Sequence, residues 1–190
     1  MPDDEEAEMK KVLLLLASGF EEIEALGTCD VLRRLGVEVT LAALSGREVA
    51  GAHGIRVLAD AELGGINADD FDALILPGGM PGAVNLLTVK DLVLEFAREG
   101  KITAAICAAP IVLSAAGVLR GRTFTMYPGF EDYLNDGEVP TGGAVECDGT
   151  VVTGRGPGAT NFFAAEVARA LGVPAERIGR TLEAMFVIPE

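Results

Sequence analysis

The sequence predicts an α/β protein in which a mostly parallel sheet carries helices on both faces. Short aliphatic runs alternate along the chain with segments whose apolar residues recur at the helical period. The aliphatic runs are apolar at nearly every position, which is typical of strands buried on both faces. A length of 190 residues, 49% of them hydrophobic, is enough for one domain with a full core.

Each predicted element follows from its local pattern. Apolar residues recur at helical spacing from Ile23 to Leu35, and Gly36 ends that helix. Three glycines in residues 45–58 predict a hairpin-like excursion, and residues 159–171 predict a late helix that is followed by another helix with a short tail. The predicted strands are residues 11–17, 37–44, 71–76, 102–106 and 150–153. Residues 1–10 are expected to be a disordered acidic tail and residues 11–190 a single domain.

Charge and cysteine content exclude several classes of function. Fifteen basic and twenty-nine acidic residues give a net charge of −14, which would repel nucleic acid and anionic membranes. The first apolar run is too short for a signal peptide or a membrane span, so we expect a soluble, cytoplasmic protein. Cys29, Cys107 and Cys147 form no CxxC pair, so we expect reduced thiols and no structural zinc. No motif indicates a metal or a cofactor.

Cys107 stands where a predicted strand meets a helix. Proline is tolerated in a helix only in its first turn, so Pro110 predicts a helix that starts near Ala108. Cys107 would then lie at the helix N-terminus, where free N–H groups and the helix dipole lower the pKa of a thiol. Small neighbours would leave room for a substrate. The alternative is that Cys107 is a small buried hydrophobe, as most free cysteines are.

Four motifs support the first interpretation. GFEEIEA at 19–25, LPGG at 76–79, AAICAAP at 104–110 and GRGPG at 154–158 occur in that order. Together they resemble the DJ-1/PfpI superfamily, specifically its DJ-1/ThiJ branch, over residues 11 to about 188. The resemblance implies a flavodoxin-like three-layer sandwich, a homodimer and a reactive cysteine at the turn between strand and helix.

The same resemblance implies the roles of four residues. Cys107 is the nucleophile, Glu24 is its acidic partner, and the backbone N–H groups of Gly79 and Ala108 bind the anion. An ionised carboxylate would oppose a thiolate, so we expect Glu24 to be protonated, to have a raised pKa and to point at Cys107.

The preceding acids, Glu21 and Glu22, are expected to be solvated charges at the start of the helix.

The sequence departs from the family pattern at two places where histidine is expected. The peptidase-like branch has a histidine directly after the cysteine, where this chain has Ala108, and the DJ-1 branch has one where this chain has Tyr127. A Cys-His-acid triad is therefore not expected. Tyr127 can donate a hydrogen bond in the pocket but is a poor general base at neutral pH. His53 lies in a predicted loop without an evident partner, and we assign it no catalytic role.

The remaining candidates are weaker. GRGPGA fits the dinucleotide pattern GxGxxA, but no further strand follows residue 171 to complete the required unit. We expect these glycines to let the turn approach Cys107, with Arg155 adding positive potential there. Cys29 on the first helix and Cys147 in a turn are expected to be packing or surface thiols.

These observations lead to two main hypotheses. The first is a cofactor-free enzyme that adds the Cys107 thiolate to small dicarbonyls such as methylglyoxal, with Glu24 moving the proton. This is chemistry of the glyoxalase III or protein deglycase type. The second is a redox sensor or stress chaperone in which Cys107 is oxidised to a sulfinate. A peptidase or amidase is disfavoured because no histidine follows Cys107. The residues alone support only an activated thiol.

Overall fold

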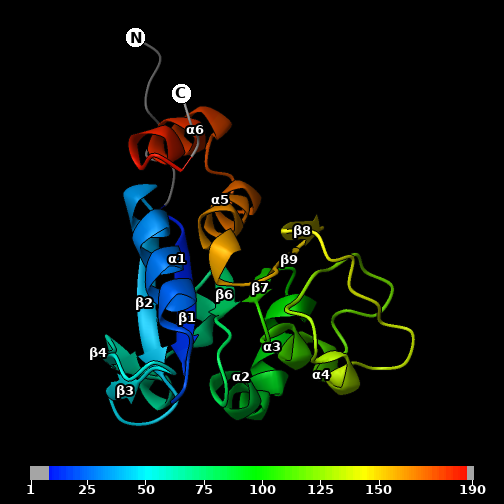
Figure 1. Ribbon diagram of the computed structural model, residues 1–190. Coiled ribbons are helices and arrows are strands. Elements are labelled where there is room, and N and C mark those ends of the chain that lie inside the picture. The colour runs from blue at the N-terminus through cyan, green and yellow to red at the C-terminus, as the bar shows by residue number, and fades with distance from the viewer. Residues whose placement is uncertain (1–8, 188–190) are drawn as a thin grey trace.

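A seven-stranded sheet forms the centre of the protein, and the computed structural model describes residues 9–187 (Figure 1). The strands run in the order β5-β2-β1-β6-β7-β9-β8. Every neighbouring pair is parallel except β8 and β9, so the predicted fold class is confirmed. The strands are β1 (Lys11–Leu16), β2 (Glu38–Ala43), β5 (Ala61–Glu62), β6 (Ala73–Leu76), β7 (Ile102–Ile106), β8 (Val145–Asp148) and β9 (Val151–Gly154).

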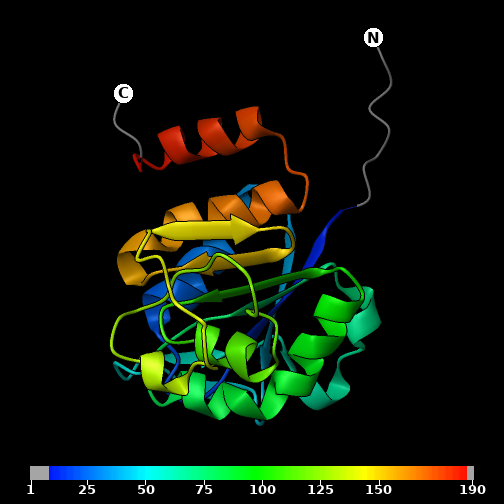
Figure 2. The ribbon, with the colours of Figure 1, turned by 90° about the vertical axis from the view of Figure 1, so that its right-hand side faces the viewer.

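Helices cover both faces of the sheet. On one face α1 packs against α5, and on the other α2, α3 and α4 lie together; Figure 2 shows the same layers turned by 90°. The last helix, α6, contacts α5 at the end of the chain (Figure 1). The helices are α1 (Glu22–Arg34), α2 (Gly82–Asn85), α3 (Lys90–Arg98), α4 (Pro110–Ala115), α5 (Thr160–Ala170) and α6 (Ala175–Ala184).

The core lies on the central strands, and the loops that follow them meet at one edge. All side chains from Val12 to Leu16 on β1 are fully buried, as expected for a strand covered on both faces. Because parallel strands end at the same edge, the segments after β1, β6, β7 and β9 converge there. Backbone hydrogen bonds join them: Glu21 N–H donates to the Gly78 carbonyl at 2.9 Å. Cys107 N–H donates to the Gly154 carbonyl, also at 2.9 Å.

The predicted hairpin is confirmed as the antiparallel pair β3 (Glu48–Ala50) and β4 (Arg56–Leu58). One prediction nearby was wrong. Cys147 does not lie in a turn. It belongs to strand β8, where it pairs with Val152 of β9, and the turn comes two residues later. Strand β8 has no signal of its own in the sequence, because its residues are at most partly buried and do not form an apolar run.

An acidic tail was predicted for residues 1–10. The first eight of these residues lie outside the described part of the chain. Lys10 already belongs to the fold, because its carbonyl accepts a hydrogen bond from Glu38 N–H at 2.9 Å. None of the helices in residues 9–187 is both long and apolar enough to cross a membrane.

Candidate active site at the Cys107 turn

Cys107 lies in a tight turn between β7 and α4, with a left-handed backbone at φ 64°. Hydrogen bonds hold this backbone on both sides: its N–H donates to Gly154, and its carbonyl accepts from Tyr127 N–H at 2.8 Å. Helix α4 begins at Pro110 rather than near Ala108. Two residues, Ala108 and Ala109, therefore lie between Cys107 and the helix, which places Cys107 on a strained strand-to-helix elbow. Its side chain is 8% exposed.

Glu24 lies in the first turn of α1 and is fully buried. Its Oε2 accepts a hydrogen bond from Gly78 N–H at 2.8 Å, and its own N–H donates to the carboxylate of Glu21 at 2.7 Å. Its Oε1 has no hydrogen-bond partner within the usual limits of distance and angle. The Cys107 thiol nevertheless lies close enough to the carboxyl group to influence its pKa through a hydrogen bond. A protonated Glu24 would use its remaining oxygen to donate toward the sulfur.

Gly78 allows the two side chains to meet. A Cβ atom at this position would lie 2.6 Å from Cys107 Cβ and 2.8 Å from Glu24 Oε2. Any side chain here would therefore separate the thiol from the carboxyl group, or displace both. The LPGG motif contained this glycine, but its role as the contact point between Glu24 and Cys107 appears only in the structure.

Burial dominates the proton affinity of the pair. Burial raises the pKa of Glu24 to about 7, against hydrogen bonds from Cys107 and Gly78 that lower it. The raised pKa predicted for Glu24 is therefore confirmed. Burial, followed by the charge of Glu24 and a hydrogen bond to it, also raises the pKa of the Cys107 thiol to about 12. The sequence predicted a lowered pKa for Cys107, and this was wrong, because the sulfur is buried and lies beside an acid.

Two backbone groups act in the direction that the sequence predicted. The N–H groups of Gly79 and Ala108 hydrogen-bond to the Cys107 sulfur and lower the pKa of its thiol, although not enough to offset burial. Gly79 reaches this position with a left-handed backbone at φ 89°. Its Cα packs against the backbone of residues 19–21, where a Cβ atom would overlap, so glycine is required there.

Comparisons with known proteins identify the family of this chain. The chain matches the DJ-1/PfpI family model over residues 10–170. It is 39% identical over 168 residues to protein dj-1beta of Drosophila melanogaster, which covers 85% of this chain and 89% of that protein. The chain belongs to the DJ-1/PfpI family. The crystal structure of the same Drosophila DJ-1beta covers 95% of this chain and 100% of its own, with a TM-score of 0.89 and 35% identity.

Two further proteins are similar to this chain. A deglycase of Pyrococcus abyssi is 39% identical over 153 residues, covering 78% of this chain and 91% of that protein. The structure of Toxoplasma gondii DJ-1, described as oxidized, covers 93% of this chain and 98% of its own, with a TM-score of 0.86 and 31% identity.

Tyr127 and Arg155 lie beside the elbow of this DJ-1/PfpI protein rather than on its sulfur. Both line a hollow of about 530 Å³, together with Pro128, Ala144, Phe162 and the 156–159 turn. The Tyr127 side chain is 45% exposed. The Arg155 guanidinium donates to the Gly142 carbonyl at 2.8 Å. A positive potential from Arg155 at the sulfur stays a prediction.

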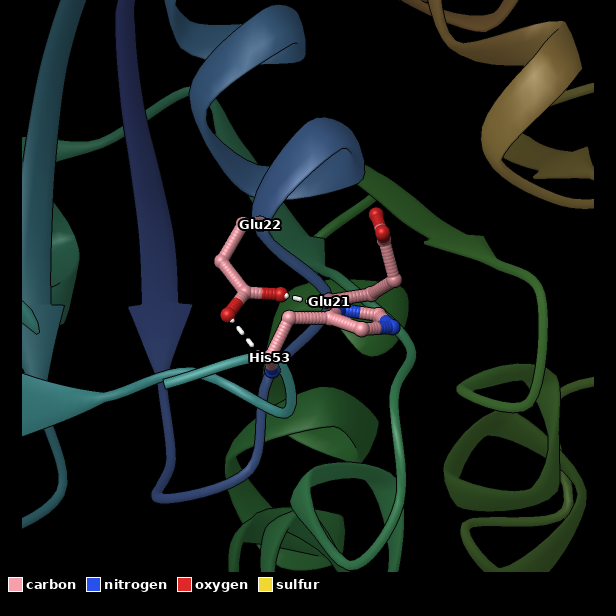
Figure 3. Close-up of side chains that lie close together, drawn as sticks. All are labelled: Glu21, Glu22 and His53. Carbon is pink, nitrogen blue, oxygen red and sulfur yellow. Dashed lines mark hydrogen bonds and ion pairs between the residues drawn. The ribbon is translucent and has the colours of Figure 1, made fainter. Parts of the chain in front are cut away.

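The structure corrects two predictions about the neighbouring acids. Glu21 and Glu22 are buried, at 7% and 4% exposure, rather than solvated. His53 has a partner, because its Nδ1 lies 2.8 Å from Glu22 Oε2 and its backbone N–H donates to Glu22 Oε1 at 2.7 Å (Figure 3). Ile23, which lies between Glu22 and Glu24, is 60% exposed, so the start of α1 turns these two acids inward and this isoleucine outward. The helical period placed Ile23 on the inner face and missed this.

Proposed function

We propose that this DJ-1/PfpI protein is a cofactor-independent cysteine enzyme that acts on reactive dicarbonyls, or on the early adducts that they form with proteins. One observation carries the proposal: a strained elbow holds Cys107 against a buried carboxyl group and two backbone N–H groups. The deglycase name of the Pyrococcus relative supports the same general role. The glyoxalase III reaction on methylglyoxal is our specific hypothesis.

The proposed reaction is internally balanced. The Cys107 thiolate bonds to the aldehyde carbon, and the resulting oxyanion is held by Gly79 and Ala108 N–H before it takes the proton of Glu24, which becomes a carboxylate. Glu24 then removes the proton from the former aldehyde carbon and returns it to the ketone carbon. The aldehyde carbon is thereby oxidised and the ketone carbon reduced, so no external oxidant is needed. Water cleaves the resulting thioester and releases lactate and the thiol.

The position of one proton determines whether the pair of Glu24 and Cys107 is in its reactive form. Burial raises the pKa of both Glu24 and Cys107, so once one proton has left, the pair shares the single proton that remains. When that proton lies on Glu24 the charge is on the sulfur, where the two backbone N–H groups stabilise it. We propose that this arrangement attacks the substrate.

Conversion of methylglyoxal to lactate tests the proposal. We expect Cys107→Ser to lower the rate at least about a thousandfold, because a hydroxyl group is a far weaker nucleophile. Cys147→Ser is the matched control, because this thiol is exposed on β8, away from the elbow, and its loss should leave the rate unchanged. Wild-type protein without lactate formation would reject the enzyme hypothesis in this form.

A second candidate function is redox sensing, with Cys107 oxidised to a sulfinate at the same donors. The oxidized state named for the Toxoplasma relative favours this candidate. It predicts that peroxide adds two oxygen atoms to Cys107, as seen by peptide mass spectrometry, in a protein that does not turn over methylglyoxal. A peptidase or amidase is less well supported, because Ala108 and not a histidine follows Cys107. Peptide cleavage that is lost with Cys107 would reverse this order.

We further propose that the protein is a homodimer, as the family resemblance implies, and that it is cytoplasmic, as its unpaired cysteines indicate. Exposed Ile23 on α1 and Phe162 on α5 offer apolar surface on two helices that contact each other. Sedimentation equilibrium of the full chain measures the assembly directly, and a monomer at micromolar concentration would contradict this part of the proposal.

A further inference from the structure

A second group of chemically active side chains lies outside the Cys107 pair. Glu21 and Glu22, at the start of α1, and His53, in the β3–β4 turn, each offer one ligand atom, and these atoms all lie within 4.8 Å of one another. Figure 3 shows the three side chains gathered where the two segments meet. The sequence did not suggest this group, because His53 follows Glu22 by 31 residues and only the fold brings them together.

The protein is locally shaped around the Glu22 carboxylate. Its Oε1 faces the backbone N–H groups of His53 and, at 3.4 Å, Ile55, while its Oε2 faces the imidazole. A Cβ atom at Gly51 would overlap the Glu22 carboxylate, so the turn can close over Glu22 only because residue 51 is glycine. The ligand geometry of Glu22 is therefore fixed by the fold and not by a flexible surface side chain.

The charge of the group is unbalanced. Glu21 and Glu22 are two adjacent, nearly buried acids, and ionised carboxylates so placed repel each other and lose hydration. The cationic partner within the group is His53, whose side chain is 71% exposed and whose second ring nitrogen is left for protonation. A divalent cation would balance both carboxylates more fully than a single imidazolium.

We propose that Glu21, Glu22 and His53 form a binding site for a divalent transition-metal ion, with Zn²⁺ as the best-fitting example. One imidazole and two carboxylates are a set that suits Zn²⁺ better than Mg²⁺, which prefers oxygen ligands alone. Water would occupy the fourth position, because the exposed side of His53 leaves it open.

The distances require only a small adjustment. Two atoms bound to one zinc ion at about 2.1 Å, at a tetrahedral angle, lie roughly 3.4 Å apart. His53 Nδ1 and Glu22 Oε2 are 2.8 Å apart, so the exposed imidazole has to move outward by well under one ångström. The proton between them leaves to solvent or moves to Nε2. Glu21 can keep one oxygen on the Glu24 N–H and turn the other toward the ion.

Titration calorimetry with ZnCl2 on the full chain tests the site. Because thiols also bind zinc, the background carries Cys107→Ser and Cys147→Ser. We expect one ion per chain. His53→Gln and Glu22→Gln should each weaken binding by at least about tenfold, since loss of even an outer partner has that order of effect. Asp69→Asn, in the exposed cluster of Asp69, Glu95 and Glu99, is the matched control and should change nothing.

The single histidine of the chain gives a second readout on wild-type protein. Zinc should shift the ¹⁵N resonance of His53 Nδ1 in proportion to occupancy, whereas MgCl2 should leave it in place. The proposal is overturned if zinc fails to bind, if binding is equally tight in His53→Gln, or if the His53 resonance does not shift when zinc binds. An equal response to magnesium would overturn the choice of a transition metal.

Discussion

Glu22 and Glu24 are two buried carboxyl groups, two residues apart on α1, with opposite proton affinities. Burial acts to raise the pKa of Glu22, but hydrogen bonds from the His53 ring and backbone outweigh it, so the pKa is lowered. Glu24 has one backbone donor, Gly78, and a thiol, and burial raises its pKa to about 7. The comparison teaches that depth of burial and the donors directed at an acid together set its charge. Glu24 lies deeper than Glu22, whose carboxylate meets the exposed His53 ring, and Glu24 also receives fewer backbone donors.

The largest effect should come from removing the proton carrier of the reactive pair. We expect Glu24→Gln to lower methylglyoxal turnover by about a hundredfold to ten-thousandfold, because an amide can accept from Gly78 N–H but cannot shuttle a proton. Steady-state kinetics measure the loss. Glu22→Gln, with the same change two residues away, serves as the control and should keep most of the activity. If both variants lose activity equally, the two acids do not differ in the way that we describe.

The second-largest loss of turnover should come from Gly78→Ala. The added methyl group would overlap Cys107 Cβ and press on Glu24, and a displacement of about 1 Å at reacting groups can cost roughly a hundredfold in rate. Gly179→Ala is the control, because nothing lies within 4 Å of a Cβ atom there. Both variants should be compared by kinetics and by thermal unfolding. A fully active Gly78→Ala would show that the contact between the two side chains is not needed.

Glu24 and Glu22 should make the free energy of unfolding depend on pH in opposite directions. Glu24 has a higher pKa in the folded protein, about 7, than its ordinary 4.5, so the folded state binds more protons between these values. Its contribution is full below about pH 4.5 and is lost as the pH rises to about 7, so Glu24→Gln should be more stable at pH 8 by about 3 kcal/mol. The lowered pKa of Glu22 has the reverse effect: its contribution is present at neutral pH and is lost as the pH falls through the folded pKa.

Urea unfolding at pH 3, pH 5 and pH 8 measures both slopes, since the Glu24 effect falls mainly between pH 5 and pH 8 and the Glu22 effect below about pH 4.5. At neutral pH we expect Glu22→Gln to lose about 1.5–3 kcal/mol, the usual range for hydrogen bonds to a charged group. Equal slopes for the two variants would contradict the assignment.

The smallest effect concerns His53. Its hydrogen bond to Glu22 raises the pKa of the imidazole above 6.5. That contribution is present below pH 6.5 and is lost as the pH rises through the folded pKa, so His53→Gln should change stability little, and only at lower pH. An NMR titration of the single histidine should give a midpoint above 6.5 in the wild type and near 6.5 in Glu22→Gln. A wild-type midpoint at or below 6.5 would refute the pairing.

The parts of the fold that could be predicted are those whose signal is local. The continuous apolar run from Val12 to Leu16 predicts a central strand because a strand covered on both faces must be apolar throughout. Gly36, at φ 81°, ends α1 as its position suggests. By contrast β8 depends on pairing with β9 and has no apolar run of its own, so its signal lies in another segment.

The features of the candidate site also divide into those with a local signal in the sequence and those without one. Cys107, Glu24, Gly79 and Ala108 could be placed because motifs before and after the strands carry them. The direction of the Cys107 pKa could not be predicted, since it depends on how deeply the elbow is buried and on a carboxyl group 83 positions earlier in the chain. The partnership of His53 with Glu22 was missed for the same reason: it requires the fold.

The left-handed backbone of Cys107 has a consequence for the stability of this chain. A residue with a β-carbon at φ 64° costs about 1–2 kcal/mol relative to a residue without one. A Cys107→Gly chain would thus be released from that strain while losing its sulfur. The strain at residue 107 is thus a cost in stability that glycine would remove, and the thiol chemistry that we propose is what would offset it.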